Sequence, residues 1–330
     1  MVRTEYDVVA VGGGTAGLIA AVQAARAGAD TLLVEKSGML GGTMTMAGVN
    51  FPGIFHAWTE QLIAGIGWEL VAKCAKEGGY ELPEHPPETA GRWWISSVRA
   101  DRGLLPLLAD EMLECSGADV LFHAMPASVA RDGDGWTLEL CTKTGLRTVR
   151  AKILVDATGD ANLATLAGFE TVRPEEVQPA TQVYRLAGYD FASLDLDAIG
   201  ASAAEAVRNG ELRRRDIAWN LESPDRKNLE WLLKAGGGNI NHIPGVQAAD
   251  SEGKTAAELE GRASVLRLYR FLKRQPGLEG LVIEYLAPEC GIRETAVVRG
   301  RHTVTLEEYT AGTRYDDAVS EVAAYLREAA

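Results

Sequence analysis

Residues 6–35 restrict the fold more than any other part of this chain. The apolar run 6–11 stops at three glycines, residues 15–27 are rich in helix-forming side chains and end at Gly28, and residues 31–35 are apolar again. Short apolar runs on either side of a helix are typical of parallel strands that are buried on both faces. The pattern therefore predicts a strand–helix–strand unit at the start of a parallel sheet.

The turn before this helix has the spacing G-x-G-x-x-G, at Gly12, Gly14 and Gly17. The first glycine permits a tight turn, the second lets backbone approach a pyrophosphate, and the third lets helix and strand pack closely. The helix N-terminus would face the phosphates, and Glu35 at the end of the second strand would accept hydrogen bonds from ribose hydroxyls. A carboxylate there disfavours a 2′-phosphate, so the motif predicts NAD or FAD rather than NADP.

Composition narrows the remaining classes. The 330 residues include 46% hydrophobic side chains, enough for a sizeable core, and the net charge of −13 disfavours nucleic acid and anionic membrane surfaces as partners. The four cysteines form no CxxC pair, which disfavours a thiolate metal site and fits reduced thiols in a cytoplasmic protein. The basic run of Arg208 and residues 213–215 is interpreted as a solvated helix face, with an anion contact as the alternative.

The middle of the chain changes to strict alternation. Residues 128–131, 136–140 and 147–150 alternate and are separated by glycine-containing turns, which predicts a three-stranded antiparallel meander. Residues 153–156 are expected to return as a separate buried strand, and His123 is expected inside a strand at 119–123. Helices are expected at 58–77, 102–115, 197–209, 228–234 and 255–274.

Several further motifs carry a resemblance to a known family. They are Gly-Gly-Thr at 41–43, Asp-Ala-Thr-Gly-Asp at 156–160 and Gly-Ile-Arg-Glu-Thr at 291–295. Together with the N-terminal glycines, they resemble the FAD-dependent oxidoreductases of the two-dinucleotide-binding-domain flavoprotein group. The likeness is greatest to the branch that includes the flavin subunit of heterodisulfide reductase.

The resemblance implies an α/β fold: a Rossmann-like FAD-binding domain with a parallel sheet and the meander, plus an α+β substrate or cap domain. We expect the FAD-binding domain at 1–169 with an excursion at about 43–100, the cap domain at 170–290, and a return segment with a C-terminal helix at 291–330. It also implies the residues that bind FAD, with adenine meeting backbone at Met125 and Pro126: Gly12, Gly14, Thr15, Ala16, Gly17, Glu35, Lys36, Gly42, Thr43, Pro126, Thr158, Gly159 and Asp160.

One departure from the family pattern is expected to matter. Family members return to the FAD domain at their C-terminus with a strand, a turn and a glycine-containing helix, and no such segment follows residues 315–318 here. A shortened member, a fragment, or a site completed by another chain would each account for this difference.

Three residues are candidates for catalysis. Arg293 beside Glu294 would be a cation fixed by its neighbour and suited to developing negative charge, although the pair could simply orient the turn. His242 lies in a glycine-flanked loop and could act as a general acid or base near neutral pH.

The leading functional hypothesis is hydride transfer between a small organic substrate and FAD, followed by electron transfer to a separate acceptor. The alternatives are a non-catalytic or partner-completed flavoprotein subunit and, less favoured because a second G-x-G-x-x-G is absent, an NAD-dependent dehydrogenase. A homo-oligomer or a partner chain is expected under the partner-completed hypothesis, and no metal is expected.

Overall fold

The computed structural model describes residues 2–53, 55–57, 60–84, 97–218, 223 and 225–316. The chain divides into two compact units. Unit 1 comprises Met1–Met44, Asn50–Thr171 and the segment from Val298 onward, and unit 2 comprises Thr45–Val49 and Val172–Val297. The expected C-terminal helix at 319–326 lies outside the described residues.

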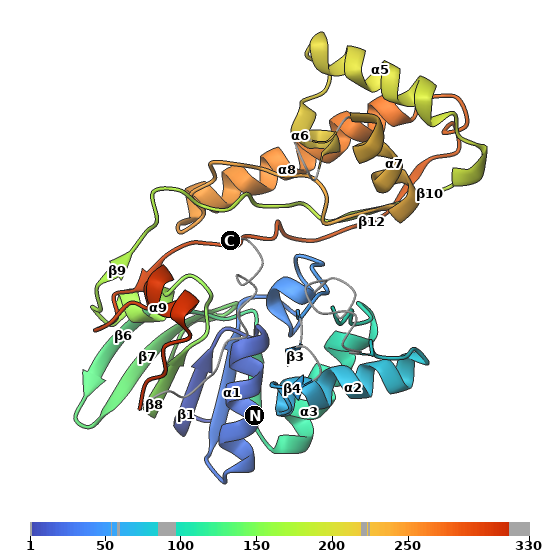
Figure 1. Cartoon of the computed structure of the whole chain (residues 1–330). Helices are drawn as coiled ribbons and strands as arrows, with labels where there is room; N and C mark the ends of the chain where they lie inside the picture. Colours follow the sequence, from blue (N-terminus) through green and yellow to red (C-terminus); the bar gives the residue numbers. More distant parts are fainter. Residues whose placement is uncertain are drawn as a thin grey trace. The chain divides into compact units, whose positions relative to one another are not determined.

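Unit 1 is built on a six-stranded sheet with the order β5-β2-β1-β8-β7-β6. Figure 1 labels four neighbouring strands of this sheet, β6, β7, β8 and β1. Strand β1 (Glu5–Val11) pairs in parallel with β2 (Thr31–Glu35) and with β8 (Gly145–Asp156), and β2 pairs in parallel with β5 (Asp119–Phe122). All five residues of β2 are buried, because apolar side chains point to both faces of a covered parallel sheet. The predicted N-terminal strand–helix–strand unit is confirmed.

The antiparallel meander is also confirmed, and it merges with the parallel sheet. Strand β6 (Met125–Asp132) pairs with β7 (Gly135–Thr142), which pairs with β8. The prediction of two separate strands at 147–150 and 153–156 was wrong, since β8 is continuous through both. Its register with β1 runs from Arg150 to Asp156, and Ile153 is 57% exposed rather than buried. Burial along this strand depends on what covers each face, which its apolar sequence does not reveal.

Helices α1, α2 and α3 of unit 1 pack against β1 and β2 in one apolar cluster. Leu18 and Val22 of α1 pack with Leu105 and Leu108 of α3 in one buried cluster. The helix expected at 58–77 begins only at residue 66, because Gly65 is extended and serves as its N-cap. A short hairpin of β3 and β4 precedes it. The elements not yet bounded are β3 (His56–Ala57), β4 (Glu60–Gln61), α1 (Thr15–Arg26), α2 (Ile66–Gly78), α3 (Leu104–Ser116), α4 (Asn162–Leu166), α9 (Leu306–Ala311) and the 3-10 turn η1 (Gly42–Met44).

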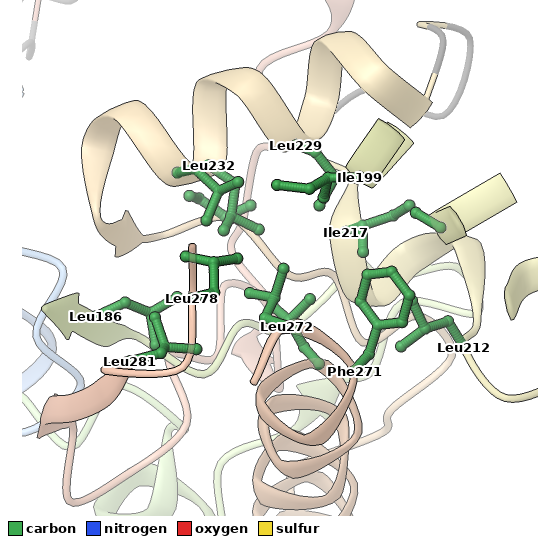
Figure 2. Packing of buried hydrophobic residues seen from close by; sticks show 14 of the residues in the cluster. Leu186, Ile199, Leu212, Ile217, Leu229, Leu232, Phe271, Leu272, Leu278 and Leu281 are labelled. Atoms are coloured by element: carbon green, nitrogen blue, oxygen red, sulfur yellow. The ribbon is translucent and has the colours of Figure 1, made fainter. Parts of the chain in front are cut away.

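Unit 2 has a three-stranded antiparallel sheet in the order β11-β10-β12, with four helices packed on its apolar residues. Its strands are β10 (Tyr184–Ala187), β11 (Gly237–Gly238) and β12 (Val282–Leu286), and its helices are α5 (Leu196–Arg208), α6 (Arg214–Ile217), α7 (Asp225–Ala235) and α8 (Ser251–Leu272). Figure 2 shows Leu229 and Leu232 of α7 pointing toward Phe271 and Leu272 of α8. The helices predicted near 197–209, 228–234 and 255–274 are confirmed.

The small strands β9 (Thr171–Val172) and β13 (Val297–Val298) form a separate pair, and a 3-10 turn, η3 (Phe191–Ser193), precedes α5. Within the described ranges, no helix combines the length and the apolar composition that crossing a membrane requires.

Candidate functional site

Two of the three motif glycines are fixed by close backbone packing. Gly12 has a φ of +106°, and a Cβ added there would lie 2.2 Å from the carbonyl oxygen of Ala157. A Cβ added to Gly17 would lie 1.8 Å from the carbonyl oxygen of Gly12. Neither position can accept a side chain without moving backbone. These glycines therefore serve the turn and the helix–strand contact, as the motif predicts.

Gly14 differs from both, because the space beside it is open. Its backbone is extended, and the nearest atom to an added Cβ is Gly42 Cα at 4.0 Å. Gly14 is the N-cap of α1, its carbonyl accepts the N–H of Leu18 at 2.9 Å, and the first helical turn contains no acidic residue. Backbone N–H groups and the positive end of the helix dipole therefore face this open space. The arrangement fits a phosphate group.

The second glycine pair lies directly against the first turn. Gly41 donates its N–H to the carbonyl of Gly13 at 2.8 Å and forms a parallel bridge with Gly14. Gly42 has a φ of +52°, and a Cβ added there would lie 2.9 Å from Gly14 Cα. The fold thus brings Gly42, and Thr43 after it in η1, to the same opening as the helix N-terminus.

Glu35 is buried at the end of β2, with 6% of its surface exposed. Its Oε2 accepts the N–H of Gly13 at 2.5 Å, and its Oε1 accepts the N–H of Ser37 at 2.7 Å. An ionised carboxylate offers about four lone-pair positions, so each oxygen retains capacity for one more donor. That capacity suits a pair of ribose hydroxyls. The adjacent Lys36 is exposed.

The start of β6 is held beside Glu35. The N–H of Ala124 donates to the carbonyl of Glu35 at 3.1 Å, which places Met125 and Pro126 one and two residues beyond this contact. His123 is not inside a strand as predicted, because β5 ends at Phe122 and His123 has a φ of +55°. Its ring fills the space next to Gly38, where an added Cβ would lie 2.9 Å from the imidazole Cε1.

The loop after β8 is organised by Asp156, which the candidate set from the sequence did not include. Its Oδ1 accepts the N–H and the hydroxyl of Thr158 at 3.0 and 2.7 Å, and its Oδ2 accepts the N–H of Ala164 at 2.8 Å. Gly159 follows with a φ of +83°, and Asp160 is partly exposed. An aspartate that ends a strand two residues before a Thr-Gly pair is a sequence signal for a turn capped by a side chain.

This loop also lies beside the glycine turn. Ala157 donates its N–H to the carbonyl of Val11 at 2.9 Å, and its own carbonyl is the atom that Gly12 accommodates. The turns after β1, β2 and β8 therefore meet at the carboxyl edge of the parallel strands, where open α/β sheets bind their ligands.

The three catalytic candidates all lie in unit 2. Glu294 accepts the backbone N–H of Gln178 at 2.7 Å and its side-chain amide at 2.9 Å, which lowers the pKa of the Glu294 carboxyl. Arg293 instead donates to Asn239 Oδ1 at 3.2 Å. The two neighbours thus have different partners, whereas the sequence suggested that Glu294 holds Arg293.

His242 lies in the loop that Arg293 contacts. The backbone N–H of His242 donates to the carbonyl of Arg215 at 3.4 Å, and the following residue, Ile243, pairs with Ala180. Burial, and secondarily the positive charge of Arg293, lower the pKa of the imidazole. This direction favours the neutral imidazole, the form that can accept a proton.

Three of the four arginines in the basic run that the sequence singled out pair with carboxylates. Arg208 pairs with Glu205 at 2.5 Å, Arg214 pairs with Asp225 at 3.0 Å, and Arg213 contacts Glu260. These pairs support the interpretation as a solvated surface.

Comparisons with known proteins place the chain among flavoproteins. The family described as FAD dependent oxidoreductase matches residues 7–326. A digeranylgeranylglycerophospholipid reductase 2 from Methanopyrus kandleri is 31% identical over 192 residues, covering 56% of this chain and 46% of the relative. A tetracenomycin B2 monooxygenase-dioxygenase from Streptomyces olivaceus is 31% identical over 194 residues, covering 48% of this chain and 35% of the relative.

Among solved structures, a geranylgeranyl bacteriochlorophyll reductase-like protein from Thermoplasma acidophilum is 17% identical with a TM-score of 0.47, covering 89% of this chain and 66% of that one. The chain spans about half the length of the curated reductases that it matches.

Proposed function

This chain belongs to the FAD dependent oxidoreductase family, and from that membership we propose that it binds FAD on unit 1 and oxidises or reduces an organic substrate. The observation that carries the proposal is the meeting of Gly14, Gly42 and Glu35 at the carboxyl edge of the sheet, with open space beside Gly14. The prediction of FAD as the cofactor, in place of NAD, is confirmed at the level of the family.

Each part of this edge has a distinct role in holding the cofactor. The N-terminus of α1 and the backbone of Gly42 and Thr43 would hold the pyrophosphate, and Glu35 would hold the adenosine ribose. The loop of Thr158, Gly159 and Asp160, fixed by Asp156, would close over the phosphates.

When bound, FAD supplies the hydride-transfer chemistry. In unit 2, Arg293 would contact the substrate, the neutral imidazole of His242 would accept a proton, and Glu294 would keep the segment of Arg293 in place through Gln178.

The finer assignments are part of the same proposal. The sequence motif at 291–295 supports a relationship to the branch of the family that includes the heterodisulfide reductase flavin subunit. A separate electron acceptor is required because a flavin that has been reduced must be reoxidised for turnover. The four free cysteines fit a reducing cytoplasm.

The visible absorption spectrum of the purified full chain tests the proposal, before and after denaturation releases the bound flavin. We expect close to one FAD per chain, either as purified or after addition of FAD. A colourless protein that takes up no FAD would contradict the proposal and favour a subunit that a partner completes.

A substitution at Gly14 separates the site from the fold. Gly14→Asp keeps a favourable N-cap residue and adds a charge that stabilises the helix start, so the unfolding temperature should not fall. The same carboxylate repels the pyrophosphate, and FAD affinity should drop by at least about tenfold. Gly14→Asn has the same shape without the charge and is the matched control, with a smaller loss.

A further inference from the structure

The segment that carries Arg293 is fixed by side chains of α8. Glu258 Oε1 accepts the backbone N–H of Cys290 at 2.9 Å, and Lys254 Nζ donates to the Cys290 carbonyl at 2.9 Å. Lys254 and Glu258 lie one helical turn apart and also pair with each other at 3.3 Å. The thiol of Cys290 is buried and donates to the carbonyl of Ala257 at 3.3 Å. Every polar group of Cys290 is therefore used to fix the chain just before Arg293.

The next residue joins this segment to the loop of His242. Gly291 and Thr181 exchange two backbone hydrogen bonds, at 2.8 and 3.0 Å, and the preceding Ala180 exchanges two with Ile243, at 3.0 and 2.9 Å. The adjacent residues 180 and 181 therefore bind both the loop of His242 and the segment of Arg293. His242 lies one residue before the first of these contacts, and Arg293 lies two residues after the second. The hydrogen bond from Arg293 to Asn239 closes the same arrangement.

A chain of buried, hydrogen-bonded polar side chains holds the loop of His242 in place. Asn241 accepts the Thr181 hydroxyl at 3.2 Å and the Gln182 N–H at 3.1 Å, and its amide donates to Ser264 at 3.4 Å. Ser264 donates to the buried carboxylate of Asp216 at 2.7 Å. The backbone around Arg293 is therefore pre-organised, which lowers the entropy cost of ligand binding.

The charges around this arrangement favour an anion. The carboxylate next in sequence, Glu294, accepts both donors of Gln178. Arg293 keeps solvent access, while the atoms packed around its guanidinium lower its pKa through burial. Helix α6, which contacts the loop of His242, carries Arg215 and Asp216, and Asp216 accepts two hydrogen bonds from Arg267. Lys254 on α8 is likewise paired with carboxylates.

We propose that Arg293 anchors an anion-binding subsite that takes the carboxylate group of an organic substrate, with His242 in the loop that Arg293 contacts. A guanidinium presents a planar fork of donors that matches a carboxylate, and a bound carboxylate offsets the effect of the Arg293 charge on His242. As a substrate class the proposal rests on the proposed flavin chemistry, whereas binding of the anion does not.

The test is a titration of the histidine ring signals by NMR in the full chain, with the His242 signal assigned from a His242→Gln variant. The probes are sodium benzoate, benzamide as its neutral counterpart, and inorganic phosphate. We expect benzoate to bind saturably and to raise the pKa of His242, because it compensates Arg293. Benzamide should leave that pKa unchanged.

Matched variants assign the response to Arg293. Arg293→Gln should raise the pKa of His242 without any ligand and weaken benzoate binding by about tenfold or more, in line with a lost charge-assisted pair. Arg185→Gln removes an exposed arginine of the same unit that pairs with Glu284, and it should retain the full benzoate response.

Several outcomes would overturn the proposal. They are a His242 pKa that ignores benzoate, a response that survives in Arg293→Gln, and phosphate binding that is tighter than benzoate binding. Flavin content is measured on the same samples, so a protein that binds benzoate without FAD contradicts only the proposed flavin chemistry.

Discussion

The two units build their candidate sites from different materials. In unit 1 the glycine turns are made of backbone, and the residues that shape them lie within short, regularly spaced motifs. In unit 2 the segment of Arg293 is held by side chains from α6, α8 and the segment at 180–182, which are far apart in sequence. A site built from backbone requires glycine, without a Cβ atom, at particular positions. A site built from side chains requires that all of its polar partners are present.

The largest effect should come from breaking the polar network of unit 2. Asp216 is fully buried and receives Arg267 Nε and Nη2 at 3.0 and 2.9 Å. Arg267→Met leaves that carboxylate buried without its cation and should lower the free energy of unfolding by about 3–5 kcal/mol in urea titrations. Arg274→Met removes an exposed ion pair with Glu211 and should cost less than about 1 kcal/mol. Equal losses of unfolding free energy in the two variants would contradict the role assigned to burial of Asp216.

In unit 1, adding a single methyl group at Gly17 should disrupt the packing of the glycine turn. Gly17→Ala forces a Cβ onto the carbonyl of Gly12 and should cost about 2–3 kcal/mol of unfolding free energy, as overpacking does. Gly67→Ala is the matched control in α2, because its Cβ would meet Ile19 Cδ1 at 3.4 Å and Phe55 Cε1 at 3.8 Å, which are ordinary contacts. It should be neutral or stabilising. Similar costs for both substitutions would contradict the packing role of Gly17.

The loop after β8 tests whether unit 1 also depends on a side chain. Asp156→Ala removes the acceptor of three hydrogen bonds that shape residues 158–164. FAD affinity, measured by titration of the apoprotein, should weaken by about tenfold, equivalent to about 1.4 kcal/mol. Asp134→Ala changes an exposed carboxylate in the turn between β6 and β7 and should leave the affinity unchanged. An unaffected Asp156→Ala protein would mean that the loop keeps its shape without this carboxylate.

A smaller effect concerns pH and unit 2. Because the pKa of His242 is lower in the folded state than its ordinary value of 6.5, the unfolded state binds the proton first as pH falls. The contribution of neutral His242 to the stability of the fold is fully present above pH 6.5 and is lost as the pH drops through the folded-state pKa. Stability measured between pH 7 and 5 should therefore decline less in His242→Gln than in the wild type. An equal decline in the two proteins would contradict this prediction.

The smallest effect should come from Tyr184. This side chain is fully buried, and its hydroxyl makes no hydrogen bond among the residues that the structure describes. Tyr184→Phe should be neutral or stabilising by up to about 1 kcal/mol, since no partner is lost. Tyr189→Phe, which removes a hydrogen bond to the Leu233 carbonyl at 2.7 Å, should cost about 1 kcal/mol. A clear loss in Tyr184→Phe would indicate a bound water at this hydroxyl.

Sequence periodicity located most helices and strands but not their limits. The alternation at 128–150 identified the meander, because period-two patterns are a local property of a half-covered sheet. The single strand through residue 152 and the late start of α2 were missed. Both depend on strand partners and on a backbone angle at Gly65, which single side chains do not encode.

For the candidate sites, the sequence by itself determined the turn in unit 1. Gly12, Gly14, Gly17 and Glu35 have fixed spacing within one strand–helix–strand unit, so their meeting follows from local geometry. Only the tertiary structure showed that Glu294 turns to Gln178, and that Asn239 receives Arg293. Such pairings join residues more than fifty positions apart, and no local propensity selects one distant partner over another. Packing of the whole unit makes that choice.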